Sequence, residues 1–422
     1  MSKIKKILAR ELLDSRGNPT IEAEVFLDNE ISARAIVPSG ASTGSKEALE
    51  LRDNDFNRFL GKGVLTAKKN IEEKINPAIQ NMDPDNQQKI DQKIIEIDGT
   101  ENKENLGSNA ILATSMAVAK VAAKNQKIKL FSHFANLGGV KNPDLLPVPM
   151  MNLINGGVHS DSGLEIQEFM IFPIGAKSFS QSLQIGAEIF HNLKKILKEN
   201  KQVVAVGDEG GFAPHLNSNF EAIETLLKAA EKAGHLNKIR IALDVAANEF
   251  FENENYIIEN SKKNCDDMIT FYNNLMKKFP EIISVEDGFE ENDFIGFEKM
   301  TKNFGDNWQI VGDDLFVTNQ NLIKVGIEKK LANAVLIKLN QIGTVSETIA
   351  AVNLAKSSGW NAIISHRSGE TEDTTIADLA VGLKTGQIKT GSLSRSDRIA
   401  KYNQLIRIEE GLGNNAKFPE AI

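Results

Sequence analysis

Short apolar runs follow one another at regular intervals through the second half of the chain. They read IALDVA, IISVEDG, QIVGDD, VLIKLN, AIISHRSGE and QIKTGS, and each has the composition and length of a buried strand. From the second run onward their charged ends lie about 23 to 28 residues apart, at Glu286, Asp313, Lys338, His366 and Lys389. Each interval has room for one strand, one helix and two loops. The pattern therefore predicts a barrel of alternating strands and helices.

The first half of the chain has a different pattern. Residues 1–37 predict strands, because IEAEVFL and ISARAIV alternate around a plausible hairpin turn at Asp28-Asn29-Glu30. After these strands the period becomes helical. Asp83-Pro84 resembles a helix start, with an acid before a proline, and residues 109–125 predict a long, Ala-rich, buried helix.

The helical pattern stops before Leu146-Pro147-Val148-Pro149, which cannot be helical. We place a domain boundary just before this segment. Residues 1–137 are predicted to form an α+β domain, and residues 138–422 are predicted to form the barrel. Functional groups gather at the C-terminal strand ends of such barrels, so the first domain is expected to cover that end.

Composition narrows the class of protein. The chain has 422 residues, 41% of them hydrophobic and 25% charged, and a net charge of −8, which does not favour a nucleic-acid-binding face. Cys265 is the only cysteine, so no internal disulfide is possible, which suits a reducing cytoplasm. We find no signal peptide, and the most apolar stretch, residues 111–123, is interrupted by Lys120 and too short to span a membrane.

Three acids end successive predicted strands. Asp244, Glu286 and Asp313 offer oxygen ligands only, and no cluster of His or Cys accompanies them. This donor set suits Mg²⁺ better than Zn²⁺ or copper. The alternative is that each acid caps a neighbouring helix, but three on successive strands favour a metal site.

A lysine and a pair of acids are candidates for proton transfer. Lys338 follows an apolar strand, where it either neutralises the acids or acts as a general base. Bound dications, Arg367 and Lys389 would disfavour its protonated form, so we favour the base. Glu209 lies in VGDEGGF at 206–212, which is either a solvated tight turn or the acid partner of Lys338.

Two further segments are suited to anion binding. VPSGASTG at 37–44 lacks the lysine of a Walker motif; it is either a linker or a mobile flap over a charged ligand, which we favour. Arg367, beside Ser368, suits bidentate binding of phosphate or carboxylate. His366 and His159 lie in polar, glycine-rich surroundings and are candidates for ligand contact.

Taken in order, these segments resemble the enolase family over nearly the whole chain. The similarity is carried by LLDSRGNPTIE at 12–22, VPSGASTG at 37–44, PMMNLINGGVHS at 149–160, QEFMIFP at 167–173, VGDEGGFAP at 206–214, SVEDGFEEND at 284–293, VGDDLFVTN at 311–319, IKLNQIGTVSET at 337–348 and SHRSGETEDTTIADLAV at 365–381. The resemblance implies a modified (β/α)8 barrel, opening with two strands and two helices, under an N-terminal α+β capping domain. It also implies the glycolytic, reversible dehydration of 2-phosphoglycerate to phosphoenolpyruvate.

The resemblance further implies a role for each site residue. Lys338 would be the base and Glu209 the acid, with Glu168 and His366 beside them. The substrate would contact His159, Gln167, Arg367, Ser368 and Lys389. Asp244, Glu286 and Asp313 would hold one Mg²⁺, and Ser39 would help to hold a second that arrives with substrate.

Some positions depart from the family pattern, among them Ser160, Ser162, His215 and Asn248. The nearest alternative function is an acid-sugar dehydratase or a racemase of the same superfamily. A scaffold role is another, through docking on an RNA-degradation assembly or display at the cell surface. The resemblance also implies a homodimer or a higher homo-oligomer in the cytoplasm.

Overall fold

The computed structural model describes residues 2–41, 44–157 and 162–419. Its first domain contains an antiparallel sheet in the order β1-β2-β3, with bounds Ile4–Leu13, Pro19–Leu27 and Ser32–Ile36. The predicted hairpin turn joins β2 to β3, and the amide of Glu30 donates to the carbonyl of Leu27 at 3.2 Å. The strands predicted in residues 1–37 are therefore confirmed.

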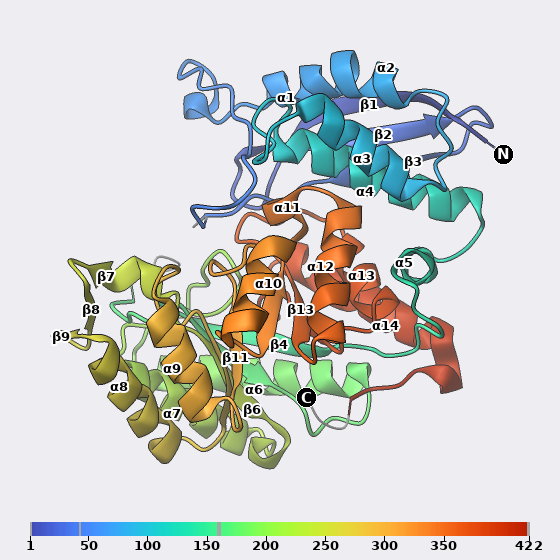
Figure 1. Cartoon of the computed structure of the whole chain (residues 1–422). Coiled ribbons are helices and arrows are strands. Elements are labelled where there is room, and N and C mark those ends of the chain that lie inside the picture. The colour runs from blue at the N-terminus through green and yellow to red at the C-terminus, as the bar shows by residue number, and fades with distance from the viewer. Residues whose placement is uncertain (1, 42–43, 158–161, 420–422) are drawn as a thin grey trace.

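The sheet packs against α1 (Leu65–Asn70), α2 (Asn76–Ile79) and α4 (Ser108–Asn125) (Figure 1). Two further helices, α3 (Gln87–Asp98) and α5 (Leu130–Gly138), pack against α4. The long buried helix predicted at 109–125 is α4. The helix start predicted at Asp83-Pro84 is wrong: α3 begins at Gln87, and the carboxylate of Asp83 instead accepts the amide of Asp85 within a turn, at 3.1 Å.

Within the described residues of the second domain, eight strands close into a barrel in the order β10-β11-β12-β13-β14-β4-β5-β6. The six predicted apolar runs form β6 (Arg240–Asp244), β10 (Ile282–Glu286), β11 (Gln309–Gly312), β12 (Ala334–Ile337), β13 (Asn361–Ser365) and β14 (Gln387–Lys389). The remaining two strands are β4 (Val148–Asn155) and β5 (Glu168–Phe172). The α/β barrel with an α+β capping domain is confirmed.

The barrel begins irregularly. Strand β5 runs antiparallel to both of its neighbours, β4 and β6, whereas the other barrel pairs are parallel. Two helices, α6 (Phe179–Glu199) and α7 (Asn219–Lys232), follow β5 before the strand-helix repeat begins. Because β5 is reversed, its first residue, Glu168, lies beside the last residue of β6, Asp244. This reversal brings the start of β5 to the end of the barrel where the other strands finish.

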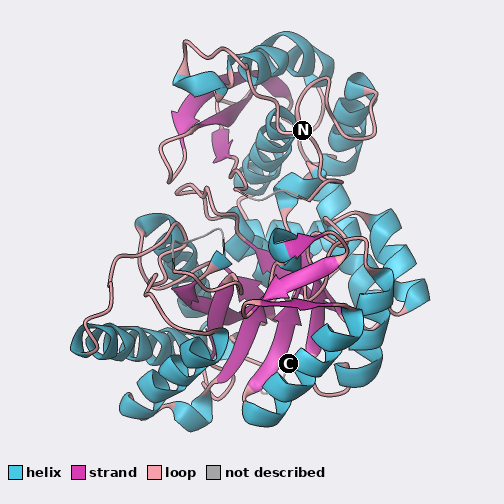
Figure 2. Ribbon diagram, turned by 90° about the vertical axis from the view of Figure 1, so that its left-hand side faces the viewer, coloured by secondary structure: helices cyan, strands magenta, loops and turns pink. Residues whose placement is uncertain are grey.

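Helices surround the barrel strands, as Figure 2 shows. Besides α6 and α7 they are α8 (Cys265–Lys278), α9 (Phe294–Phe304), α10 (Gln320–Lys329), α12 (Val345–Ser357), α13 (Thr375–Gly382) and α14 (Ser396–Leu412). The short helix α11 (Leu339–Ile342) instead contacts α4 of the first domain (Figure 1). A small sheet of β7 (Phe251–Glu252), β8 (Asn255–Ile258) and β9 (Ser261–Lys263) interrupts the repeat after β6. Of the helices in the described part of the chain, none has the length and apolar character needed to cross a membrane.

The first domain lies over the carboxyl end of the barrel strands (Figure 1). Ser39 and Gly369 form a bridge between the domains, in which each amide donates to the other's carbonyl at 2.8 Å. In a second backbone contact between the domains, the amide of Ser15 donates to the carbonyl of Glu370 at 2.8 Å. These backbone contacts place the beginning of the 37–44 segment directly above the loop that follows β13.

Candidate active site

The three predicted metal-binding acids lie at neighbouring strand ends. Asp244 ends β6, Glu286 ends β10 and Asp313 directly follows β11, and each is at least nine-tenths buried. Asp244 and Glu286 are register partners between their parallel strands. The apolar runs bury the strands, so their shared direction carries all three carboxylates to one end of the barrel.

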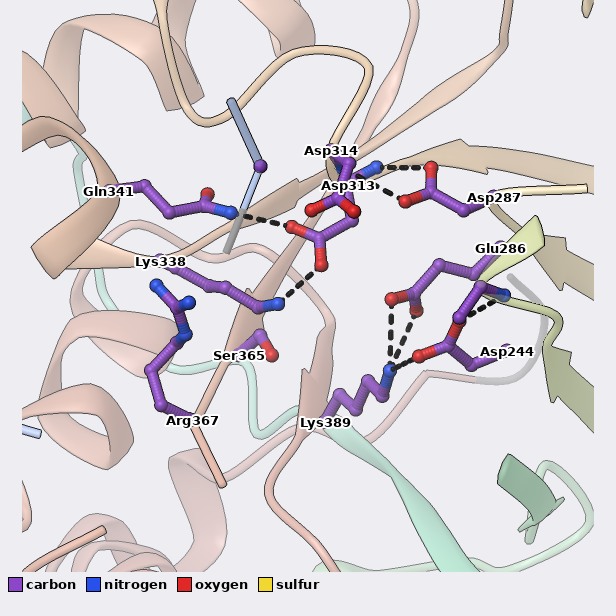
Figure 3. A network of polar contacts seen from close by, with 12 residues as sticks. Asp244, Glu286, Asp287, Asp313, Asp314, Lys338, Gln341, Ser365, Arg367 and Lys389 are labelled. Atoms are coloured by element: carbon purple, nitrogen blue, oxygen red, sulfur yellow. Dashed lines mark hydrogen bonds and ion pairs between the residues drawn. The ribbon is translucent and has the colours of Figure 1, made fainter. Parts of the chain in front are cut away.

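Two lysines bring positive charge to these acids (Figure 3). The ammonium of Lys389 lies 2.8 Å from the carboxylate of Asp244 and 2.9 Å from that of Glu286. Lys338, which follows β12, forms a close ion pair with Asp313. Lys389 also lies 3.3 Å from Glu168, so it links two of the predicted ligands, Asp244 and Glu286, to this carboxylate on the other side of the site.

Burial and neighbouring charge shift the pKa values of these groups. Burial, reinforced by the nearby charge of Asp244, raises the pKa of Glu286 well above its ordinary value. Burial is the largest single influence and lowers the pKa of Lys338, but the nearby carboxylates, of which Asp313 acts most strongly and Glu286 next, together raise the net pKa. This direction is opposite to the one expected for Lys338 from the sequence. Arg367 and Lys389 each lower the pKa of Lys338, as expected, but each has a smaller effect than the charge of Asp313.

The acids fit a hard dication chemically, because they are buried, close together and offer only oxygen donors. The tightest groupings differ from the predicted triad, however. Among the residues the structure describes, one ligand atom from each of Asp287, Asp313 and Asp314 lies within 4.8 Å of the others, and the same holds for Glu168, Glu209 and His366. In the predicted triad, Lys389 binds two members and Lys338 binds the third. Acidic clusters that could hold a metal are thus present at this end of the barrel.

The predicted acid Glu209 is held by the turn that carries it. The amide of Gly210 closes the turn onto the carbonyl of Gly207 at 3.0 Å, and Gly210 has a φ of +85°. A Cβ on Gly210 would lie only 2.4 Å from the carbonyl oxygen of Ser394, so this close approach requires glycine. The Glu209 side chain accepts a hydrogen bond of 3.1 Å from Asn152 on β4.

Glu168 and His366 lie beside Glu209, and all three are almost completely buried. Burial, followed by the nearby charge of Glu209, raises the pKa of Glu168 well above its ordinary value. Burial lowers the pKa of His366 well below its ordinary value, so the imidazole is neutral. The Nε2 atom of His366 is 3.5 Å from Oε1 of Glu209. The sequence-predicted acid group is therefore assembled in space.

The anion-binding candidates lie at the same end of the barrel. Arg367 and Ser368 line a cavity together with Lys338, Lys389 and the acid group. Arg367 makes a two-point ion pair with Glu47, with distances of 2.8 and 3.2 Å. Glu47 follows the predicted flap in sequence and was missed by sequence reasoning, because nothing in its local motif marks it.

Of the remaining predicted residues that the structure describes, Ser39 does not line this cavity. The hydroxyl of Ser39 donates to Glu50 at 2.9 Å and accepts from Arg52 at 3.1 Å, so the contacts of this hydroxyl lie within the first domain. Gln167 does line the cavity and donates to Asp244 at 3.3 Å. His159 lies outside the described residues, as does Ser160.

Several supporting residues were missed although their motifs were visible. The carboxylate of Asp287 accepts the amides of Asp313 and Asp314, both at 2.9 Å. Asn248, one of the departures from the family pattern, donates to Asp314 at 2.8 Å and accepts the amide of Glu291, also at 2.8 Å. The sequence signal that could have identified them was the second acid of each motif, which is Asp287 in VEDG and Asp314 in VGDD. These residues fix the loops that follow β6, β10 and β11.

Two family models match the chain and together cover most of it. The model described as "Enolase, N-terminal domain" matches residues 4–134. The model described as "Enolase, C-terminal TIM barrel domain" matches residues 143–421. These matches agree with the closed barrel and with the α+β domain above it. The chain therefore belongs to the enolase family.

Proposed function

We propose that this protein is a Mg²⁺-dependent phosphopyruvate hydratase, which interconverts 2-phosphoglycerate and phosphoenolpyruvate in glycolysis. One observation carries the proposal: a single cavity is lined by Lys338, by Glu209 and by the Arg367-Ser368 pair. These supply a candidate base, a candidate acid and a candidate phosphate site within reach of one small substrate. Family membership supports a hydro-lyase reaction.

The proposed reaction divides between two proton transfers. Neutral Lys338 takes the proton from the carbon next to the substrate carboxylate, and the electron pair of the C–H bond moves into that carboxylate. The intermediate then re-forms its carboxylate as the C–O bond at the next carbon breaks. Glu209 gives its proton to the departing hydroxyl, which leaves as water. The pKa of neighbouring Glu168 is raised, so its surroundings favour the protonated form of a carboxyl group. This favours the retention of one proton by the pair Glu168 and Glu209.

Positive charge is needed where the intermediate becomes more negative. Lys389 is buried and lies among Asp244, Glu286 and Glu168, close to where a substrate carboxylate would bind. Asp244, Glu286 and Asp313 would hold Mg²⁺, which would supply further positive charge to the substrate carboxylate. Magnesium bound to Asp313 would also compete with Lys338 for this carboxylate, which favours the neutral form of the lysine.

Arg367 and Ser368 would make the site selective for a phosphorylated substrate. A guanidinium in a two-point contact with a carboxylate has the geometry that also suits a phosphate. A phosphate bound here would contact Arg367 at the same time as Glu47. Because Glu47 belongs to the first domain, phosphate binding would be linked to the position of that domain. A sugar acid without a phosphate would leave the buried Arg367 without its anionic partner from the substrate.

A substrate panel tests this proposal. Purified protein with Mg²⁺ is offered 2-phosphoglycerate and, separately, a series of sugar acids, and product formation is followed by absorbance and mass spectrometry. We expect turnover of 2-phosphoglycerate only. Turnover of a sugar acid with none of 2-phosphoglycerate would instead identify an acid-sugar dehydratase of the same superfamily.

A further inference from the structure

Arg398, on the first turn of α14, is completely buried beneath the candidate active site. Its guanidinium donates to the carbonyls of Arg367 at 2.5 Å, Ser368 at 2.6 Å and Asp208 at 3.0 Å. It also makes a close hydrogen bond with Nδ1 of His366. One side chain thus connects the loop after β13 with the turn that carries Glu209.

The contact with His366 determines which ring nitrogen carries the proton. A guanidinium has only donors and remains protonated in proteins, so Nδ1 of His366 must be the acceptor. An imidazole whose Nδ1 accepts a hydrogen bond has no hydrogen on that atom, so the ring is the neutral form and not the doubly protonated cation. A neutral imidazole has one N–H group, which must then be at Nε2. Nε2 is the atom that lies 3.5 Å from Glu209.

We propose that Arg398 is a positioning residue that holds His366 as its Nε2–H tautomer, a hydrogen-bond donor toward Glu209. This inference rests on the proposed function, in which Glu209 gives its proton to the departing hydroxyl. With a hydrogen on Nε2, His366 cannot take that proton from Glu209. It instead stabilises the carboxylate that Glu209 becomes when water has left. The opposite tautomer would present a bare nitrogen to Glu209 and compete for its proton.

The same guanidinium also positions Glu209 itself. Arg398 holds the carbonyl of Asp208, next to Glu209, and the carbonyl of Glu209 accepts the amide of Ser392 at 2.8 Å. Gly391 allows this close packing, because a Cβ there would lie 2.8 Å from both Arg398 Cδ and the Glu209 carbonyl. Arg398 therefore holds both His366 and the turn that carries Glu209. A test must distinguish its effect on the tautomer of His366 from its effect on the position of Glu209.

The tautomer is measured directly by NMR of protein with ¹⁵N-labelled histidine, in which His366→Gln identifies the His366 signal among the six histidines. We expect a bare Nδ1 and a protonated Nε2 in the wild-type protein. We expect Arg398→Met to give a mixture of tautomers, whereas Arg240→Gln, at the opposite end of the barrel, leaves the signal unchanged. A protonated Nδ1 in the wild-type protein overturns the proposal even if Arg398→Met does not fold.

Kinetics then test the consequence for Glu209. Arg398→Lys keeps the charge but loses the fork of donors. We expect kcat for dehydration to fall at least about tenfold, because proton transfer by a positioned acid is worth about 10²–10⁴ in rate. KM and solvent exchange of the proton next to the carboxylate should change less than about threefold. An equal fall in exchange and dehydration, or an unchanged kcat, contradicts the proposal. Failure of the wild-type protein to turn over 2-phosphoglycerate contradicts the proposed function alone, because the NMR result does not depend on turnover.

Discussion

At the scale of single residues, charge pairing separates the two proposed proton transfers. Lys338 is paired with Asp313, whereas Glu209 is grouped with Glu168 and His366. Lys389 lies between the groups, in contact with Asp244, Glu286 and Glu168. Each group has its own buried partners. Removing one transfer should therefore leave the other measurable.

Replacing Lys338 or Glu209 tests this separation. Lys338→Ala removes the proposed base, so exchange of the proton next to the carboxylate with solvent should be abolished. Glu209→Gln removes only the proposed acid, so exchange should continue while dehydration falls by about 10²–10⁴. Proton NMR of 2-phosphoglycerate in deuterated buffer measures exchange. Exchange that survives in Lys338→Ala, or stops in Glu209→Gln, would reverse these assignments.

At the scale of elements, side chains of the first domain cap the N-terminus of a barrel helix, α12. Asp91 on α3 accepts hydrogen bonds from the amide of Ser346, at 3.0 Å, and from its hydroxyl, at 2.6 Å. Ser115 on α4 accepts the amide of Val345 at 3.0 Å. Both amides belong to the first turn of α12, where backbone donors have no partner within the helix. The capping groups for α12 therefore come partly from another domain.

Removing Asp91 should weaken this junction in a pH-dependent way. Asp91→Ala leaves buried donors unpaired, which should cost about 1–3 kcal/mol of unfolding free energy. Burial raises the pKa of Asp91 to about 6, whereas an unfolded aspartate titrates near about 4. The folded state therefore binds more protons between these values, and the stabilisation by Asp91 falls as pH rises from about 4 to about 6.

Urea unfolding at about pH 4.5 and about pH 7 measures this effect. The difference between wild type and Asp91→Ala should be larger at the lower pH. Asp85→Ala, a nearby exposed acid, serves as the control and should have little effect at either pH. A difference that grows with rising pH would contradict the assignment of the raised pKa to Asp91.

At the scale of the whole molecule, ion pairs fasten the two domains together. Asp373, in the loop after β13, accepts hydrogen bonds from Lys120 on α4, at 2.5 Å, and from the amide of Ile36 on β3, at 3.1 Å. Lys103, near the start of α4, lies 3.0 Å from Glu347 on α12. The end of β3, the region around α4 and the barrel elements that they contact therefore belong to one connected arrangement.

Loss of Asp373 should loosen this arrangement. Asp373→Ala strands the largely buried Lys120, and breaking such a pair costs about 3–5 kcal/mol. Calorimetry should show a lower unfolding temperature and a first transition that separates from the second. Glu372→Ala changes an exposed neighbour and should leave the trace unchanged. An Asp373→Ala trace that matches the wild type would show that other contacts hold the domains together.

Sequence periodicity was sufficient for six of the eight described barrel strands and for helix α4, because burial imposes a regular apolar pattern on them. It was insufficient where contacts between residues far apart in the sequence determine the start of a helix or the role of a side chain. The Asp83-Pro84 signal is a local one, yet α3 begins later, with Gln87 buried against Ser115. Glu47 and Arg398 bear no local signature, since their roles depend on partners far away in the chain. The irregular start of the barrel, with two strands and two helices, was implied by family resemblance and not by spacing, and the reversed direction of β5 was not predicted.

The central claim is that a magnesium-dependent site dehydrates 2-phosphoglycerate, and its most direct test is the absorbance of the enol product. The protein is supplied with 2-phosphoglycerate and Mg²⁺, then with excess chelator, and then with Mg²⁺ again. We predict that absorbance rises, stops rising on chelation and resumes when the metal returns. Absence of product at saturating Mg²⁺, or a rate that chelation leaves unchanged, would contradict the account.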